Sequence, residues 1–481
     1  ADLSIRQDLS ALTKGLAAEA SVSFDNIGGM NETTNKEYRY MNSNASITSD
    51  GTLVTTPAIY GTDSETLGHT QPFERLMLRS DFQAKVDYNR TFGKHQVGGA
   101  LIYDMQSVVK NGRNNSQKNQ SVLVNATYTY DNRYSLNAVF NRSGSAYLPD
   151  GDKYSNYPAV SAAWIVSNEA FMEKVTPINL FKIRASYGLS GWDGNLSHEL
   201  WRQSYGSGGA GYNFGVNAGG QSGGSEGDLP VIGLVAEKSQ KATFGFDLAA
   251  FDNRLNATVE GFYEKRSDIL VSGANSTSGI IGITVGQVNE GIYKYKGLDA
   301  SLSWNDKIGD FHYGIGASMS YLNTEVVNVN QAYQEYDYLY TKGNRIGQMY
   351  GLEAIGFFNS QQEINNSPQQ TFSDVAPGDV KYKDQNGDNR IDEKDVVKMF
   401  GSSVPRFYFG FNLNFSYKRV ELSADFQGMT GVTVSLLNSP LYSPLVSNGN
   451  ISNTFLNEEI SWTPENKTNA TMPRLTTQEN L

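Results

Sequence analysis

Twelve residues in the last quarter of the chain have the spacing of a calcium-binding loop. Oxygen ligands at positions 1, 3, 5, 7, 9 and 12 of an EF-hand loop hold the ion, position 7 through its main-chain carbonyl. The matching oxygens here belong to Asp384, Asn386, Asp388, the Arg390 carbonyl, Asp392 and Asp395. Such an ion would stiffen a loop outside the cell and would not take part in catalysis.

Two positions depart from the EF-hand pattern. The sixth is Asn389 in place of Gly, although Asn tolerates the left-handed backbone conformation that this position needs. The twelfth is Asp395 in place of Glu, so a two-oxygen grip on the ion is less secure. The alternative is a solvated acidic turn, in which Asn-Gly pairs and Asp-rich runs are common.

A Gly-rich stretch between residues 191 and 233 carries five aromatic side chains. Aromatic faces can stack on sugar rings or contact peptide side chains, so this stretch is a candidate substrate-binding loop. The alternative is that the same rings pack against neighbouring structure or against a partner. The five candidates are Trp192, Trp201, Tyr205, Tyr212 and Phe214.

The sequence contains no pattern typical of an enzyme. No H-E-x-x-H zinc pattern and no G-x-S-x-G elbow occurs, and the paired Glu458 and Glu459 are interpreted as solvated loop residues. His312 falls on a polar row without a nearby Ser and Asp arrangement, so it is interpreted as a lone polar histidine. The four histidines are His69, His95, His198 and His312.

The elements that carry these residues follow a two-residue repeat. From Phe407 to Tyr417, one face is wholly apolar and the other is mostly Asn, Ser and Gly, because alternate side chains of a strand point to opposite faces. A tight turn near Lys418 and Arg419 follows, and the alternation resumes. Similar hairpins occur over 122–140, 243–263 and 298–321.

These strands fit a transmembrane β-barrel better than a soluble β-sandwich or β-helix. They run for about 9–11 residues or more, as tilted membrane-spanning strands do. Their polar faces carry rows of Asn, Asp, Glu and Ser, which a packed core would not accept. Short turns such as 252–254 alternate with long polar stretches, as in barrels with long outer loops. The candidate long loops are 26–72, 189–238, 328–345, 359–403 and 437–470.

Composition agrees with this fold class. Among 481 residues there are 28 Tyr, 23 Phe and 48 Gly, which favour strands and turns over helices. The mean hydropathy is −0.44 and no run of 18 apolar residues occurs, which excludes a transmembrane helix but allows barrel strands. The net charge of −11 argues against nucleic-acid binding. Cysteine is absent, which excludes disulfides and thiolate metal sites.

An ordered set of segments resembles the SusC/RagA family of TonB-dependent outer-membrane transporters. Each segment alone is moderately specific, whereas their common order along nearly the whole chain is highly specific. The segments are "YSLNAVFNRSGSAYLPDGDKYSNYPAVSAAWIVSNEAFM" (134–172), "LFKIRASYGLSG" (180–191), "KSQKATFGFDLAAFDNRLNATVEGFYEKRSDIL" (238–270), "GNRIGQMYGLEAIGFFNSQQEI" (343–364), "APGDVKYKDQNGDNRIDEKD" (376–395), "VPRFYFGFNLNFSYKRVELSADFQGMTG" (404–431) and "WTPENKTNATMPRLT" (462–476).

The resemblance implies that residues 1–481 are one part of a 22-stranded barrel in the bacterial outer membrane. We expect 14 to 16 strands here, beginning near Leu16, and an all-β fold surrounded by lipid. Nothing in this chain resembles the family's N-terminal TonB-contacting segment or its plug domain, and the family's last strands should follow residue 476. Ala1 does not begin a signal peptide, so we expect the chain to start after processing or within a longer protein.

The resemblance also implies nutrient import. Family members work with a SusD-like surface lipoprotein that covers the barrel, and the TonB–ExbB–ExbD complex acts through the N-terminal region. They import oligosaccharides or, in some members, oligopeptides, without covalent chemistry. Two rival interpretations remain: a passive porin or adhesin barrel, and a barrel hydrolase, which would need a catalytic triad that the sequence does not show.

Overall fold

The computed structural model describes residues 1–47, 53–110, 116–213, 220–275, 280, 282–283, 285–436, 439, 452–456 and 460–476. Its contacts divide the chain into two compact units. The first unit comprises residues 1–25, 78–349 and 398–433, and the second comprises residues 26–77, 350–397 and 434–481.

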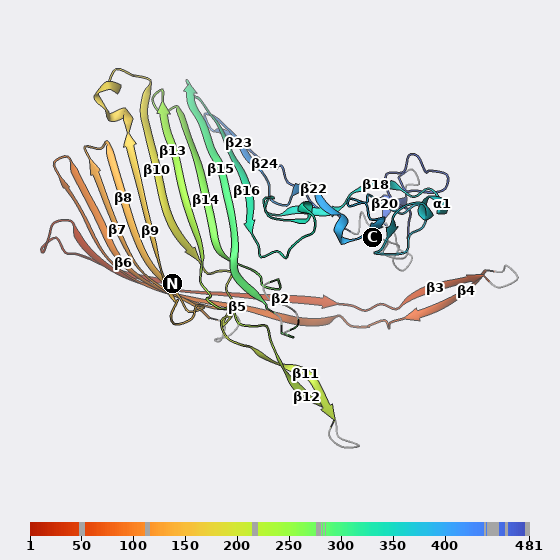
Figure 1. The fold of residues 1–481 in the computed structure, drawn as a ribbon. Helices are drawn as coiled ribbons and strands as arrows, with labels where there is room; N and C mark the ends of the chain where they lie inside the picture. The colour runs from red at the N-terminus through yellow and green to blue at the C-terminus, as the bar shows by residue number, and fades with distance from the viewer. Residues whose placement is uncertain are drawn as a thin grey trace. The chain divides into compact units, whose positions relative to one another are not determined.

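Fourteen strands form one large sheet, in which sequence neighbours are also spatial neighbours. Every register that the structure defines within this sheet is antiparallel. Figure 1 shows β6 to β10 and β13 to β16 running side by side as a curved sheet. In order across the sheet, the strands are β1 (Asp2–Asp8), β2 (Leu16–Asn35), β5 (Gly68–Phe92), β6 (His95–Lys110), β7 (Ser116–Tyr130), β8 (Tyr134–Ser145), β9 (Tyr154–Ile165), β10 (Ile178–Trp192), β13 (Glu237–Ala250), β14 (Leu255–Ser272), β15 (Gln287–Ile308), β16 (Phe311–Asn328), β23 (Phe407–Tyr417) and β24 (Val420–Thr430).

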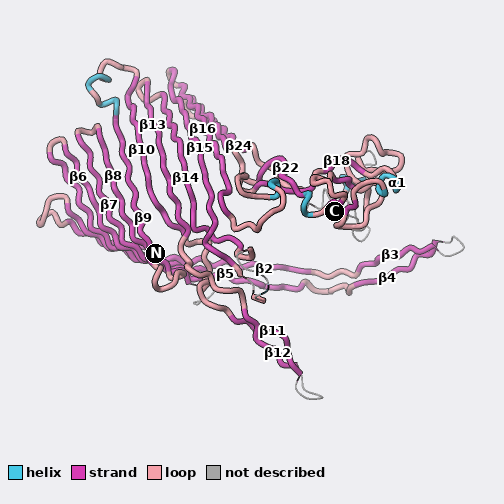
Figure 2. Tube along the Cα trace, in the orientation of Figure 1, coloured by secondary structure: helices cyan, strands magenta, loops and turns pink. Residues whose placement is uncertain are grey.

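The remaining strands form five two-stranded sheets. Helices are few and short in the described part of the chain, and the trace is dominated by strand and loop (Figure 2). The two-stranded sheets pair β3 (Tyr40–Ile47) with β4 (Leu53–Tyr60), β11 (Tyr205–Asn213) with β12 (Gly220–Glu226), β17 (Gln348–Leu352) with β22 (Val396–Ser402), β18 (Ala354–Phe357) with β20 (Val380–Tyr382), and β19 (Gln369–Gln370) with β21 (Arg390–Ile391). The helical segments are α1 (Gln361–Asn365) and 3₁₀ turns at Val166–Asn168, Ala170–Met172, Asp337–Leu339, Glu393–Asp395 and Asn453–Leu456.

The predicted alternation is confirmed, and the registers align it across strands. Residues paired from strand to strand form transverse rows across the sheet. One such row is apolar apart from the glycine at its end, and the adjacent row, one residue further along each strand, is polar or glycine throughout. The apolar row joins Ile183, Phe246, Val259, Ala300, Met319, Phe409 and Gly428. The polar row joins Lys182, Asp247, Thr258, Ser301, Ser318, Gly410 and Gln427.

The apolar face is exposed rather than packed against protein. Phe409 and Leu302 are each 51% exposed, and Phe426 is 58% exposed. An apolar face of this extent suits contact with lipid. No helix in the described part of the chain is long and apolar enough to span a membrane.

The short turns gather at one end of the sheet, together with paired aromatic rings. Positive φ angles at Asp131, Asn132 and Lys418 close two of these turns tightly. Ring pairs beside the turns include Tyr134 with Trp164 and Phe311 with Phe415. Aromatic rings at strand ends form the interfacial girdle of outer-membrane barrels. The other end of the sheet carries the long connections 193–236 and 329–406.

The apolar core lies in the connections at the long-loop end. Leu148 and Leu234 are 2% and 0% exposed, and they form one cluster with Tyr147, Leu196 and Val231. Burial of such a side chain stabilises the structure by about 1.5–3 kcal/mol. This cluster holds Leu196, Val231 and Leu234 of the 193–236 connection against Tyr147 and Leu148 of the connection between β8 and β9.

Two expectations differ from the structure. The sheet begins with β1 at Asp2, one strand before the expected start near Leu16. Segments expected to be long loops also contain paired strands, namely the β3–β4 hairpin within 26–72 and the β11–β12 hairpin within 189–238. Long hairpins can extend beyond a sheet because each strand satisfies the other's backbone hydrogen bonds.

Candidate functional site

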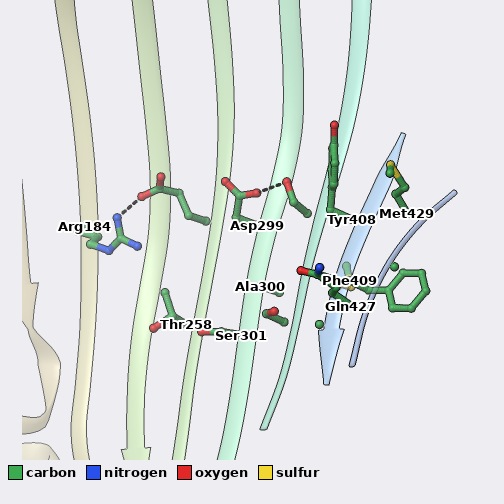
Figure 3. A pocket seen from close by; sticks show the side chains of 15 residues that line it. Arg184, Thr258, Asp299, Ala300, Ser301, Tyr408, Phe409, Gln427 and Met429 are labelled. Atoms are coloured by element: carbon green, nitrogen blue, oxygen red, sulfur yellow. Dashed lines mark hydrogen bonds and ion pairs between the residues drawn. The ribbon is translucent and has the colours of Figure 1, made fainter. Parts of the chain in front are cut away.

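The polar face of the large sheet carries a cavity of about 790 Å³ that crosses β10, β14, β15, β16, β23 and β24. Alternation places Arg184, Glu260, Asp299, Ser320 and Tyr408 on this face, each at the same height on its own strand. Figure 3 shows Arg184, Asp299 and Tyr408 among the side chains that line the cavity, each on a different strand. A closed barrel would turn this face toward its lumen.

Two cations of β10 pair with carboxylates of β13 and β14 on this polar wall. Arg184 contacts Glu260 through Nη1 and lies 3.3 Å from Asp247 Oδ2 through Nε. The Lys182 ammonium lies 3.1 Å from the same Asp247 oxygen. Asp247 on β13 is therefore matched to cations on the neighbouring strand β10, and Arg184 reaches across β13 to Glu260 on β14. These contacts offset the cost of removing the charges from bulk water.

Asp299 on β15 faces Glu260 directly in the strand register. Like charges in directly opposed positions repel each other. The side chain of Asp299 instead accepts a hydrogen bond of 2.6 Å from the Ser320 hydroxyl, while Arg184 contacts Glu260 (Figure 3). The wall thus offers oxygen acceptors at Asp299 and hydroxyls at Ser301, Ser318 and Tyr408 to whatever fills the lumen.

Of the five predicted loop aromatics, the three whose side chains the structure describes, Trp192, Trp201 and Tyr205, have different surroundings. Trp201 packs against the Leu148 and Leu234 core, with the Arg202 guanidinium 4.3 Å from its ring centroid. Trp192 ends β10 and is 54% exposed, and Tyr205 begins β11 and is 73% exposed. Tyr212 lies in β11, but its side chain and the whole of Phe214 lie outside the described residues.

The predicted calcium loop closes through its own side chains. Asp384 accepts hydrogen bonds from the amides of Gly387 and Asn389, at 2.7 and 2.9 Å. Asn389 has a φ of 62°, the left-handed conformation expected at the sixth position. Asp395 is fully buried and accepts from the Gln385 and Asp392 amides at 2.7 and 2.9 Å.

The remaining positions of that loop form tight turns. Asn386 accepts from the Asp388 amide at 3.0 Å, Asp388 from the Arg390 amide at 2.8 Å, and Asp392 from the Lys394 amide at 2.8 Å. Across the described residues, no group of three or more His, Asp or Glu side chains converges as a metal site. The loop is therefore ordered by protein hydrogen bonds, and calcium binding stays a prediction.

The histidines lie apart from one another. His312 lines a polar cavity near the short turns, as the alternation predicts, and His69 lies 3.2 Å from Glu32. His95 contacts the Tyr128 hydroxyl at 2.7 Å, and His198 meets the edge of Tyr147. Glu458 and Glu459 lie outside the described residues.

An antiparallel sheet with an exposed apolar face, an aromatic girdle and a polar inner wall defines an outer-membrane β-barrel. The chain belongs to the TonB dependent receptor-like, beta-barrel family, whose model matches residues 5–463. This family assignment confirms the resemblance to SusC/RagA-type transporters, the all-β barrel fold and the outer-membrane location.

Characterised relatives agree with the family. The chain is 29% identical over 352 residues to TonB-dependent receptor P26 of Formosa agariphila, covering 71% of this chain and 34% of the relative. It is 20% identical to TonB-dependent receptor SusC of Bacteroides thetaiotaomicron, covering 68% of this chain and 32% of the relative. The chain thus spans about a third of the length of these relatives.

A solved structure shares the fold. The structure of the RagAB peptide transporter superposes with a TM-score of 0.71 at 16% identity, over 97% of this chain and 51% of that chain. The same complex in its "closed-closed" state gives a TM-score of 0.69.

The sequence interpretation missed the Arg184–Glu260–Asp247 network. Each member occupies a polar position of an alternating strand, which is the signal that could have identified it. Their contact depends on the registers of β10, β13 and β14, which sequence spacing alone does not give.

Proposed function

We propose that the full-length protein imports oligosaccharides or oligopeptides across the outer membrane in a TonB-dependent manner. The observation that carries this proposal is the continuous polar wall, in which charged and hydroxyl side chains keep one register from β10 to β24. Such a wall can hold a plug and a hydrated solute while the opposite face contacts lipid.

The partners belong to the same proposal. A SusD-like lipoprotein would cover the long-loop end of the barrel, and TonB with ExbB and ExbD would act on a segment N-terminal to the barrel. The family assignment and the relatives named TonB-dependent receptors support this arrangement. The barrel supplies binding surfaces and a path, and no covalent step is part of the proposal.

The loop aromatics and the acidic loop have supporting roles in it. Trp192 and Tyr205 present exposed rings that can stack on a sugar or a peptide side chain, whereas Trp201 holds the loop to its core. The acidic loop would hold Ca²⁺ through Asp384, Asn386, Asp388, Arg390, Asp392 and Asp395, as a structural ion.

Co-purification and uptake test the proposal together. The full-length protein would be extracted from native outer membrane in mild detergent, and its stoichiometric partners identified. Uptake of labelled oligosaccharide and oligopeptide mixtures would be compared in cells with and without TonB. A lipoprotein partner and TonB-dependent uptake support the importer. A barrel that purifies alone, with uptake independent of TonB, would indicate a passive porin.

A further inference from the structure

Another cavity, of about 620 Å³, lies where β16 ends and β23 begins. It is at the end of the sheet that carries the long connections, which faces the outside of the cell in outer-membrane barrels. Its lining includes three cations and a single carboxylate among the described residues: Arg345, Lys398, Arg406 and Glu325.

Among the residues that the structure describes, the cations of this cavity have no carboxylate partner. Glu325 lies 4.0 Å from Lys294, which is not part of the lining. Within the described ranges, no ion pair joins Arg345, Lys398 or Arg406 to a carboxylate. Elsewhere on the same chain, Arg184 and Arg474 each contact at least one carboxylate. The cavity therefore concentrates positive charge that no carboxylate of the described residues pairs with.

Arg345, which lines the cavity, has one donor that no protein group of the described residues uses. Its Nη2 donates a hydrogen bond of 2.8 Å to the Val404 carbonyl, while its Nε is buried without a hydrogen-bond partner. A buried unpaired donor on a charged group is costly and is normally matched by a ligand or by water. Burial lowers the pKa of the Arg345 guanidinium, and the positive charge of Arg406 lowers it further. Both effects disfavour the charged form of Arg345 in the bare cavity.

The walls of the cavity are fixed by hydrogen bonds between two separate segments. The side-chain amide of Gln348 donates through Nε2 to the main-chain carbonyls of Met399 and Gly401, each at 2.7 Å. The buried Ser402 hydroxyl donates to the Ile346 carbonyl at 2.8 Å. These bonds hold the Arg345 segment against the strand that carries Lys398, so the cations are positioned before any ligand arrives.

Arg406 is held by its main chain and by a glycine. Its carbonyl accepts from the Leu322 amide at 2.8 Å, and its amide donates to the Thr430 carbonyl at 3.0 Å. Gly431 has a φ of 71°, and a Cβ at this position would lie 2.8 Å from the Arg406 Cβ. The glycine thus lets the chain close against Arg406, whose side chain lines the cavity.

We propose that this cavity binds a carboxylate group of the transported substrate, with Arg345 and Arg406 as its two guanidinium ligands and Lys398 at its edge. A planar guanidinium matches a carboxylate with two parallel hydrogen bonds. The chain has a net charge of −11, which repels acidic solutes. A substrate that carries carboxylates would therefore need a local cationic site in order to bind. The inference rests on the proposed import function and narrows its substrate class to acidic oligomers.

Calorimetric titration of the full-length protein, together with any partner that co-purifies, tests the site. Trigalacturonate and triglutamate are the carboxylated probes, and galactotriose and triglutamine are their neutral matches. We expect one carboxylated probe to bind and its neutral match to bind about tenfold more weakly or worse. The probe that binds distinguishes a sugar acid from an acidic peptide as the source of the carboxylate.

Variants assign the binding to the cavity. The double variant Arg345→Gln/Arg406→Gln should weaken binding about tenfold or more. Arg406→Lys, which keeps the charge but loses the two-pronged geometry, should give an intermediate loss. Arg419→Gln, at the short turn on the opposite end of the sheet, is the matched control and should leave the affinity unchanged.

Three outcomes would overturn the proposed site. The carboxylated and neutral probes bind equally, neither carboxylated probe binds, or a folded double variant keeps full affinity. Because Arg406→Lys retains the charge, it stays informative where the double variant does not fold. If the protein shows TonB-dependent uptake but binds no carboxylated probe, the importer function is retained and the acidic substrate class is rejected. If the carboxylated probe binds but uptake does not depend on TonB, the carboxylate site is retained and the importer function is rejected.

Discussion

Arg474 donates two parallel hydrogen bonds to Asp379, from Nε to Oδ1 at 2.7 Å and from Nη2 to Oδ2 at 3.1 Å. The carboxylate is 4% exposed and also accepts from the Ala376 amide at 2.8 Å. The two residues are 95 positions apart, so this pair joins the last described segment of the second unit to the β18–β20 region. It is a local determinant of that unit's fold.

Replacement of Arg474 by Leu should destabilise this region. The substitution leaves the buried Asp379 carboxylate without its cation, and we expect a local loss of about 2–3 kcal/mol, reduced from the fully buried case because Arg474 is partly exposed. The Gly378 amide donates to the Phe358 carbonyl, and the Phe358 amide donates to the Asp379 carbonyl. Hydrogen exchange at these two amides measures the local loss of stability. Arg474→Lys should give a smaller effect, and unchanged exchange in Arg474→Leu would show that the pair contributes nothing.

Asp395→Asn should open the acidic loop. The carboxylate uses both oxygens to accept main-chain amides, and an amide side chain keeps only one acceptor and presents a donor to a donor. The expected cost is about 1–3 kcal/mol. Faster exchange of the Gln385 amide reports it. Glu393→Gln, an exposed acid-to-amide change in the same loop, is the control, and equal effects of the two variants would contradict the assigned role of Asp395.

Calcium at about 1 mM, the range of extracellular modules, should slow exchange of amides between residues 384 and 395. The ion would add to a loop already ordered by its own hydrogen bonds. Asp388→Asn should remove much of the calcium effect because it removes one of the negative ligands. Exchange that is the same with calcium and with a chelator would end the calcium proposal.

Acid should loosen the α1 region through Glu363. Its carboxylate accepts from the Asn359 amide at 2.9 Å and from the Lys381 ammonium at 3.0 Å, and these contacts, the amide first, hold the pKa of Glu363 below its ordinary value. Because the folded pKa is the lower one, the stabilisation is complete above the ordinary value of 4.5 and is lost as pH falls through the folded pKa.

The comparison that isolates this effect is Glu363→Gln at each pH. The variant should lack the acid-dependent part of the loosening, measured as protection of the Asn359 amide relative to wild type. A variant that follows the wild-type pH profile would locate the acid sensitivity in another group.

The two faces of β23 should respond oppositely to a charge. Phe411→Lys places an ammonium on the lipid face and should cost about 2–4 kcal/mol at mid-membrane. Asn412→Lys places it on the polar face, opposite Asp425 in the register, and should cost far less. Urea unfolding in lipid vesicles measures both. Equal destabilisation would mean that the faces are assigned wrongly.

The sheet was predictable from sequence because strand alternation is a local property. Phe407 to Tyr417 forms β23 with the expected ends, and the turn at Lys418 has the expected tight geometry. Strand β1 was missed because its alternation covers only Leu3 and Ile5 among charged neighbours. A short alternating run resembles an irregular segment until a partner strand satisfies its backbone.

The candidate sites were less predictable because they depend on contacts between distant segments. The left-handed Asn389 followed from a local pattern, whereas the proximity of Arg345 to Arg406 follows from how the 329–406 connection folds back on β16. Sequence periodicity carries no information on such a fold. Trp201 shows the same limit, since its place in an apolar cluster depends on Leu148, which lies 53 positions earlier (201 − 148).

The shared register of the transverse rows constrains how this protein can change its length. Deletion of one residue of β16 before Ser318 would shift the following residues by one position. Ser318 and Ser320 would then face lipid, and Met319 would face the polar side. Insertions and deletions inside strands should therefore keep the faces only when they change the length by an even number of residues, a constraint that does not apply to irregular segments of the connections. Divergence among homologues should consequently accumulate at one end of the barrel, and the wall should keep its residue count.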